Sequence, residues 1–273
     1  MIDTIYRRKS VRNFENNPLS KIDYDFVLQE IQSLNTNSGP FKNRFDFFFL
    51  ENKEGSPDSA RRIGTYGFIK NPFAFIGGTS LKDFKSMVDY GYVLEHFILN
   101  LTGRGIGTVW LGGTFQRDVL SDKLNPDQVI PCIIAIGYEA NKKHLKERII
   151  RNVIQANSRK PFNHLFFDEE WSIPISEDHS LAKVFDLVRV APSASNKQPW
   201  RILLKKDKIH LFLERTPNYA NMLNFDIQAI DMGIALCHLE LGLQELHIDY
   251  SFVEDLTVSA DNLVYVISVQ LEL

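Results

Sequence analysis

Four cationic side chains and one hydroxyl lie close together near the start of the sequence. They fall within six consecutive positions: Arg7, Arg8, Lys9, Ser10 and Arg12. Phosphate recognition uses this combination, because guanidinium and ammonium groups supply charge and a hydroxyl can contact a further oxygen. A solvated basic tail is the alternative interpretation. Val11 and Phe14 favour an ordered segment, since both apolar side chains can anchor it to a folded core.

A second polar segment, residues 191–200, places small hydroxyl residues and two carboxamides between two prolines. Pro192 and Pro199 restrict the backbone, so that amide and hydroxyl groups are held pointing outward. Such a loop suits hydrogen bonding to a polar heteroaromatic ring system. An ordinary turn between a helix and a strand is the alternative. Ser193 is not predicted to be a hydrolase nucleophile, because no GxSxG motif surrounds it.

A third segment, residues 103–113, contains five glycines. A dinucleotide-binding fingerprint needs glycines between a strand and the helix that follows it, whereas these follow a predicted helix. We therefore reject the Rossmann interpretation. The glycines still allow a backbone to approach a flat ligand closely.

Composition favours small-molecule chemistry. The 273 residues carry a net charge of -3, and the pI is near 6.2, so nucleic acid is not an expected partner. The two cysteines lie far apart, and the histidines form no close pair, so we expect neither a disulfide framework nor a catalytic metal. No stretch is apolar enough to span a membrane or to serve as a signal peptide. We expect a cytoplasmic protein.

An internal repeat is the clearest sign of organisation. At an offset of 142 positions, seven residues of 231–248 are identical to their counterparts in 89–106. Three of these identities involve less common residue types: Asp89 with Asp231, Gly91 with Gly233, and His96 with His238. Shared amphipathicity is a poor explanation for them, and we interpret them as an internal duplication. The recurrence of the histidines favours a packing role for both.

Each half is predicted to contain a first helix, a strand, a long helix and a closing strand. In the first half these span residues 21–34, 45–50, 89–106 and 130–136, and in the second half 179–190, 200–204, 231–248 and 264–271. This order indicates an α+β fold that occurs twice. We place the first half at residues 1–160 and the second at 161–273. The basic residues 141–160 form the predicted connector, which we expect to be helical.

The motifs resemble those of the nitroreductase and flavin reductase family. Residues 8–14, Arg-Lys-Ser-Val-Arg-Asn-Phe, are similar to that family's RRSxRxF, and residues 191–200 are similar to its APSxxNxQPW. The resemblance implies a fold of mainly antiparallel sheets flanked by helices. It also implies an FMN site at a subunit interface, with the basic motif from one subunit and the Pro-Ser loop from the other.

The two motifs are divided between the halves. Residues 35–45, the first half's equivalent of the Pro-Ser loop, lack NxQPW, and residues 166–175, the second half's equivalent of the basic motif, are acidic. The chain therefore resembles a fused dimer, or pseudo-dimer, with one intact FMN site and one lost site. It is similar in this respect to the subgroup of thermophile nitroreductases.

The resemblance assigns cofactor contacts position by position. The phosphate and ribityl chain of FMN would contact the basic and hydroxyl side chains of Arg8, Lys9, Ser10 and Arg12. From the other half, the flavin would be contacted by Pro192, Ser193, Ala194, Asn196 and Gln198. The segment over the flavin N5 region is Trp110, Leu111, Gly112 and Gly113, with Gly112 where other members carry an acidic residue. Arg159 best matches the family's closing basic segment, and Lys146 and Arg148 are weaker alternatives.

The resemblance implies NAD(P)H-driven reduction of a small-molecule acceptor, such as a nitroaromatic compound or a quinone, through hydride transfer at flavin N5. No protein nucleophile or general acid is needed, which agrees with the lack of a catalytic dyad. Three alternatives remain: an FMN-binding protein with little turnover, a different flavin reaction, and a fold relative without a cofactor.

Overall fold

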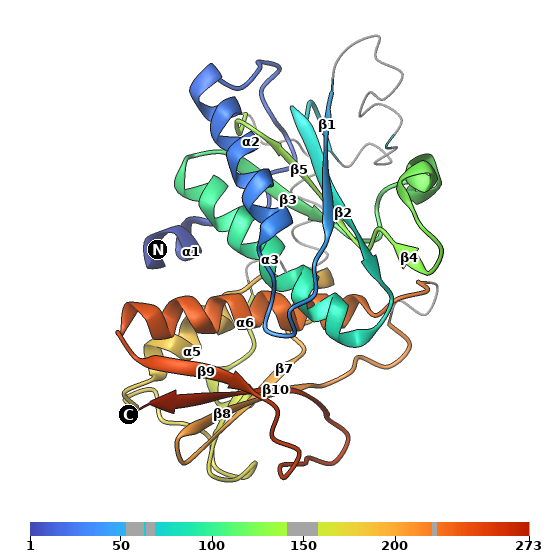
Figure 1. Cartoon of the computed structure of the whole chain (residues 1–273). Helices are drawn as coiled ribbons and strands as arrows, with labels where there is room; N and C mark the ends of the chain where they lie inside the picture. Colours follow the sequence, from blue (N-terminus) through green and yellow to red (C-terminus); the bar gives the residue numbers. More distant parts are fainter. Residues whose placement is uncertain (53–62, 64–68, 141–157, 220–222, 273) are drawn as a thin grey trace.

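The computed structural model describes residues 1–52, 63, 69–140, 158–219 and 223–272. Within these residues the chain forms two sheets, and two long helices pack against each other between them (Figure 1). The fold is α+β, as the sequence predicts. Residues 141–157 lie outside the described residues, and so does most of the connector predicted to be helical.

The first part of the chain is built on a five-stranded sheet. Its helices are α1 (Ile2–Arg7), α2 (Lys21–Thr36) and α3 (Phe84–Gly103), and a 3-10 helix spans Arg117–Lys123. Its strands are β1 (Asp46–Glu51), β2 (Ala74–Leu81), β3 (Gly107–Leu111), β4 (Gln128–Val129) and β5 (Ile133–Gly137). The strand order is β1-β2-β5-β3, β4 pairs with β2, and all pairs are antiparallel.

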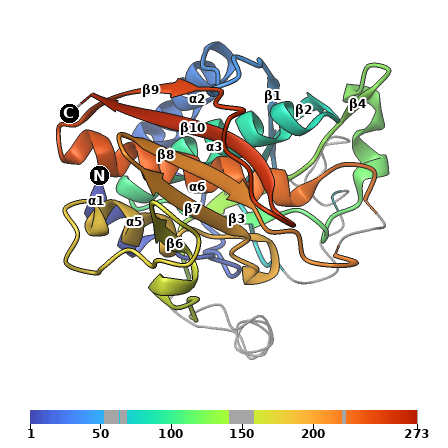
Figure 2. The same cartoon turned by 90° about the horizontal axis from the view of Figure 1, so that it is seen from below.

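The second part contains another five-stranded sheet (Figure 2). Its helices are α5 (Ala182–Arg189) and α6 (Ile227–Glu245), with 3-10 helices at Phe162–His164 and Ala194–Asn196. Its strands are β6 (Phe166–Asp168), β7 (Trp200–Lys205), β8 (Lys208–Leu213), β9 (Asp249–Val253) and β10 (Val264–Glu272). The order is β6-β7-β8-β10-β9, with only β6 and β7 parallel among the described strands. Apart from β4 in the first sheet and β6 in the second, the two sheets share the same strand order.

The predicted elements occur with shifted ends. Helix α3 begins at Phe84, five residues before the predicted start, because the Asp83 side chain accepts a hydrogen bond from the Ser86 backbone N–H and caps the helix there. The strand predicted over 130–136 begins only at Ile133, as β5, and a separate short strand, β4, ends just before the predicted range. Pro131 lies between them, and proline has no N–H to donate to a sheet.

Helices α3 and α6 cross at two glycines. A Cβ atom on Gly91 would lie 2.1 Å from the Ile230 carbonyl oxygen, and one on Gly233 would lie 1.8 Å from that of Val88. A residue with a side chain cannot be accommodated at this distance. Val88 and Ile230 are separated by the same 142 positions as the glycines, so the contact has two-fold pseudosymmetry.

Candidate functional site

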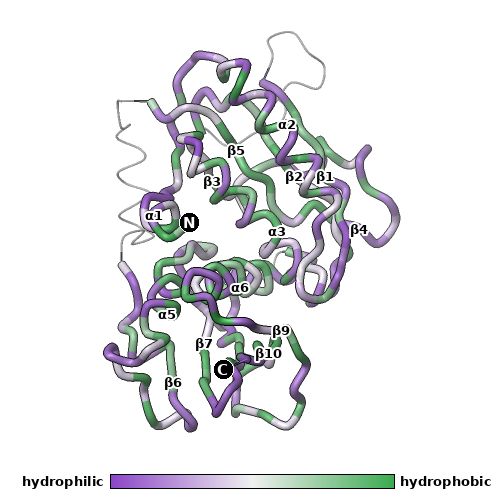
Figure 3. Tube along the Cα trace, turned by 60° about the vertical axis from the view of Figure 1, so that its left-hand side comes forward, coloured by the Kyte–Doolittle hydropathy of each residue, from purple (hydrophilic) through white to green (hydrophobic). Residues whose placement is uncertain are grey.

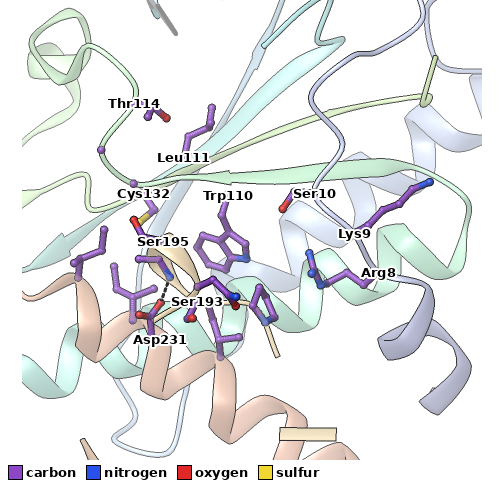
Figure 4. A pocket seen from close by; sticks show the side chains of 18 of the residues that line it. Arg8, Lys9, Ser10, Trp110, Leu111, Thr114, Cys132, Ser193, Ser195 and Asp231 are labelled. Carbon is purple, nitrogen blue, oxygen red and sulfur yellow. Dashed lines mark hydrogen bonds between the residues drawn. The ribbon is translucent and has the colours of Figure 1, made fainter. Parts of the chain in front are cut away.

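A cavity of about 860 Å³ lies between the two parts, beside the end of β3 and the first turns of α6 (Figure 4). Thirteen of the fourteen predicted cofactor-binding residues line it: Arg8, Lys9, Ser10, Arg12, Trp110, Leu111, Gly112, Gly113, Arg159, Pro192, Ser193, Ala194 and Asn196. Arg8 and Ser10 lie on one side of Trp110, and Cys132 and Thr114 lie on the other (Figure 4). The fourteenth residue, Gln198, does not line the cavity.

The basic motif is an ordered part of the first half. The Val11 backbone N–H donates to the Thr108 carbonyl oxygen at 2.9 Å, which holds the segment alongside β3. Val11 and Phe14 are buried, as the sequence predicts. Helix α1, which precedes the motif, lies beside α5 and α6 (Figure 3). The solvated-tail interpretation is therefore wrong.

A buried carboxylate organises this side of the cavity. Glu95 is fully buried on α3 and accepts a hydrogen bond from Trp110 Nε1 at 2.9 Å. Its other oxygen lies 3.9 Å from Arg8 Nε and 3.1 Å from His238 Nε2. Glu95 thus links the basic motif, β3 and α6. The sequence analysis missed it, because a glutamate on an amphipathic helix is ordinarily solvent-exposed.

The Pro-Ser loop is held by its own polar groups. Ser193 Oγ accepts from the Gln198 backbone N–H at 2.9 Å, and Gln198 Nε2 donates to the Asn196 carbonyl oxygen at 3.1 Å. Gln198 Oε1 accepts from the Lys160 backbone N–H at 2.8 Å. Gln198 therefore shapes the loop with its amide group and does not line the cavity.

Arg159 joins the basic motif from the end of the connector. Its guanidinium donates to the Val190 carbonyl oxygen at 3.0 Å and to Asn196 Oδ1 at 3.4 Å. Burial lowers the pKa of Arg159, and the positive charges of Arg8 and Arg189 lower it further. Arg8 and Arg159 therefore bring positive charge together at one end of the cavity, which favours an anion there. The alternatives Lys146 and Arg148 lie outside the described residues.

The two glycines after β3 serve different purposes. A Cβ atom on Gly112 would lie 2.6 Å from Ile227 Cδ1, so this glycine allows α6 to pack closely. A Cβ atom on Gly113 would meet nothing within 4 Å. The backbone itself therefore forms this part of the cavity wall.

Helix α6 supplies a wall that the sequence analysis did not predict. Its cavity-lining residues are Ile227, Ile230, Asp231 and Ile234. Asp231 Oδ1 accepts from the Ala194 backbone N–H at 2.8 Å. Burial raises the pKa of Asp231 well above its usual range, and this hydrogen bond only partly opposes the shift. The repeated Asp-x-Gly pattern was the available signal, but it was interpreted as a mark of duplication alone.

Charged side chains occupy the pseudosymmetric counterpart of the glycine wall. At the repeat offset of 142 positions, Glu254 corresponds to Gly112, and Lys85 corresponds to Ile227. Lys85 and Glu254 form an ion pair, and the Lys85 ammonium lies 5.1 Å from the centre of the Phe41 ring. A half-exposed ion pair therefore takes the place of the close contact between Gly112 and Ile227.

An aromatic side chain takes a second counterpart position. Tyr92 corresponds to the cavity-lining Ile234. Its hydroxyl donates to Glu240, and its ring packs edge to face on Phe252 at a centroid distance of 6.2 Å. The two sides of the helix pair are thus no longer equivalent.

Across the described ranges, no group of three or more His, Cys, Asp or Glu side chains could hold a metal ion. None of the described helices is long and apolar enough to cross a membrane.

The two-part fold is a nitroreductase fold. The chain belongs to the family described as "Putative TM nitroreductase", whose model matches residues 1–243. A solved structure of a "putative nitroreductase" from Thermotoga maritima is 20% identical, with a TM-score of 0.58, and the match covers 98% of this chain and 91% of that one. A comparison with curated proteins gave no match.

Shorter solved structures match about half of the chain. A nitroreductase family protein from Clostridium difficile 630 is 19% identical, covering 56% of this chain and 91% of that one, with a TM-score of 0.42. An FMN-dependent nitroreductase from Clostridium difficile R20291 is 20% identical, covering 52% of this chain and 90% of that one, with a TM-score of 0.42.

Proposed function

We propose that this flavin-type oxidoreductase binds one FMN in the cavity and uses NAD(P)H to reduce a nitroaromatic or quinone-like acceptor. One observation carries the proposal: the cavity has cationic side chains at one end and apolar side chains at the other, and both halves of the chain build it. Family membership supports a flavin oxidoreductase in general.

The residues present fit FMN at both ends. Arg8, Ser10 and Arg159 would hold the phosphate, because charged and hydroxyl donors suit its oxygens. The apolar residues of α6 and the indole of Trp110 offer surfaces for a planar ring system. A bound phosphate would also relieve the mutual repulsion of Arg8 and Arg159.

When bound, FMN would supply the redox chemistry by accepting a hydride from NAD(P)H at N5 and passing electrons to the acceptor. The chain's own task is to bind and orient. Glu95 would fix Arg8 and Trp110, and Asn196 and Gln198 would fix the loop from the opposite half. No nucleophile or general acid of the protein is assigned.

The site also bears on the origin of the chain. We propose that it is a fused dimer, with halves at residues 1–160 and 161–273, that retained one of two former sites. The shared strand order and the pseudosymmetric glycine crossing support a duplication. The Lys85–Glu254 pair and Tyr92 support the loss of the second site.

Purified protein reconstituted with FMN should show bound-flavin absorption and consume NAD(P)H when a quinone or nitroaromatic acceptor is added. Bound FMN without turnover of any acceptor would favour an FMN-binding protein. Stoichiometric reduction by NAD(P)H followed by failure with both acceptor classes would favour another flavin reaction. Protein that stays colourless with added FMN would refute the proposal.

A further inference from the structure

Arg117 holds the glycine wall of the cavity from outside. It lies in the 3-10 helix after Gly113 and does not line the cavity. Its guanidinium donates to the carbonyl oxygen of Gly112, to that of Ile130 at 3.2 Å and to that of Pro131 at 2.7 Å. One side chain thus connects the glycine turn to the segment that precedes β5.

Two aromatic rings from different parts of the chain hold the guanidinium. Its central carbon lies 4.5 Å from the ring centre of Phe115 and 5.2 Å from that of Phe225. Phe225 is buried just before α6 in the second half. Planar guanidinium groups stack well on aromatic faces, which restricts their rotation. Arg117 is therefore fixed by both halves.

The bond to the Gly112 carbonyl also sets the direction of a donor. In a trans peptide the C=O and the following N–H point in opposite directions, and the described residues contain no cis peptide bond. Since the Gly112 carbonyl points to Arg117, behind the wall, the Gly113 N–H points away from it, toward the cavity side. Gly113 lines the cavity, and no side chain covers this amide from its own Cα.

We propose that Arg117 is a positioning residue: it fixes the peptide between Gly112 and Gly113 so that the Gly113 N–H donates to the ring system in the cavity. The inference rests on the proposed function, in which that ring is the isoalloxazine of FMN. A donor held in place before charge develops on the ring requires no reorganisation when the ring is reduced. Arg117 therefore influences both cofactor affinity and cofactor potential without touching the cofactor.

The test compares Arg117→Lys and Arg117→Met with wild-type protein. Lysine keeps the charge, but a single ammonium cannot bridge three carbonyls and stack between two rings. We expect either change to weaken FMN binding by about 3- to 10-fold, as for a lost hydrogen bond, and to lower the midpoint potential of bound FMN. Arg104→Met is the matched control, because Arg104 also stacks on a ring, Phe26, but lies outside the cavity.

A second measurement needs no variant at Arg117. In wild-type protein labelled with ¹⁵N-glycine, FMN titration should shift the Gly113 amide resonance, which a Gly113→Ala variant identifies. If FMN binds but this resonance does not move, the inference is overturned and the proposed function stands. The same holds if folded Arg117→Lys keeps wild-type affinity and potential. If wild-type protein does not bind FMN, both fall. If the Arg117 variants fail to fold, the wild-type resonance decides.

Discussion

Replacing Arg8 with alanine should weaken FMN binding without unfolding the protein. The Arg8 side chain is 7% exposed, so its guanidinium acts in a largely desolvated environment where a charged hydrogen bond is worth about 1.5 to 3 kcal/mol. That range corresponds to a loss of affinity of about 10- to 150-fold. The change should lower stability, because Glu95 loses a nearby cation, but Glu95 keeps its contacts with Trp110 and His238, so we expect the variant to fold.

The assay is fluorescence titration of FMN against apoprotein at two salt concentrations, with a urea unfolding curve for each variant. Arg104→Ala removes the same charge from an ion pair with Asp23 outside the cavity, and should leave affinity within about twofold of wild type. The affinity of Arg8→Ala should also depend less on salt, because one phosphate contact is lost. An Arg8→Ala protein that is folded and binds FMN as tightly as Arg104→Ala would refute the phosphate assignment.

Three further predictions concern the frame of the site. Gly233→Ala should lower the free energy of unfolding by about 3 kcal/mol, because the added Cβ atom meets the backbone of α3. Gly103→Ala is the control, since a Cβ atom there meets nothing within 3.6 Å. Equal urea midpoints for the two variants would contradict the close helix crossing. Glu95→Gln should cost about 3 to 5 kcal/mol in urea unfolding, since it removes a buried negative charge beside the buried Arg8 guanidinium. A cost no larger than the roughly 1 kcal/mol expected for Glu254→Gln in an exposed pair would rule this out. The pKa of Asp231 is raised in the folded state, so the folded protein keeps a proton that the unfolded chain loses above about pH 3.9. The stability that this group contributes therefore falls as the pH rises through the folded-state pKa. Asp231→Asn should therefore gain stability relative to wild type as pH rises, and parallel pH curves would show that Asp231 is ionised.

Short sequence motifs identified the parts of the site in which function restricts the type of residue. Cations around Ser10 and the bracketed loop at 192–196 were recognisable because phosphate and ring recognition restrict the residue types. The structure places both segments on one cavity. The helix and strand that flank the loop, α5 and β7, were also predictable apart from their ends, whereas α1, which precedes the basic motif, was not predicted.

The wall formed by α6 was not predictable in the same way. Residues 227–243 of this helix are all buried, so hydropathy distinguishes no face, and the cavity-lining side chains look like any other core residues. Glu95 and Arg117 were missed for a related reason. Each acts through partners distant in sequence, and their importance follows from packing between the halves.

The number of FMN molecules bound per chain tests the central claim most directly. Isothermal titration of apoprotein, with protein concentration fixed by amino-acid analysis and FMN by absorbance, measures it. We expect one FMN per chain, because one cavity holds both motifs and charged and aromatic side chains occupy its pseudosymmetric counterpart. Two FMN per chain would show that both sites of the fused pair remain open, and half an FMN per chain would show that the site is shared between chains. Either result would contradict the account.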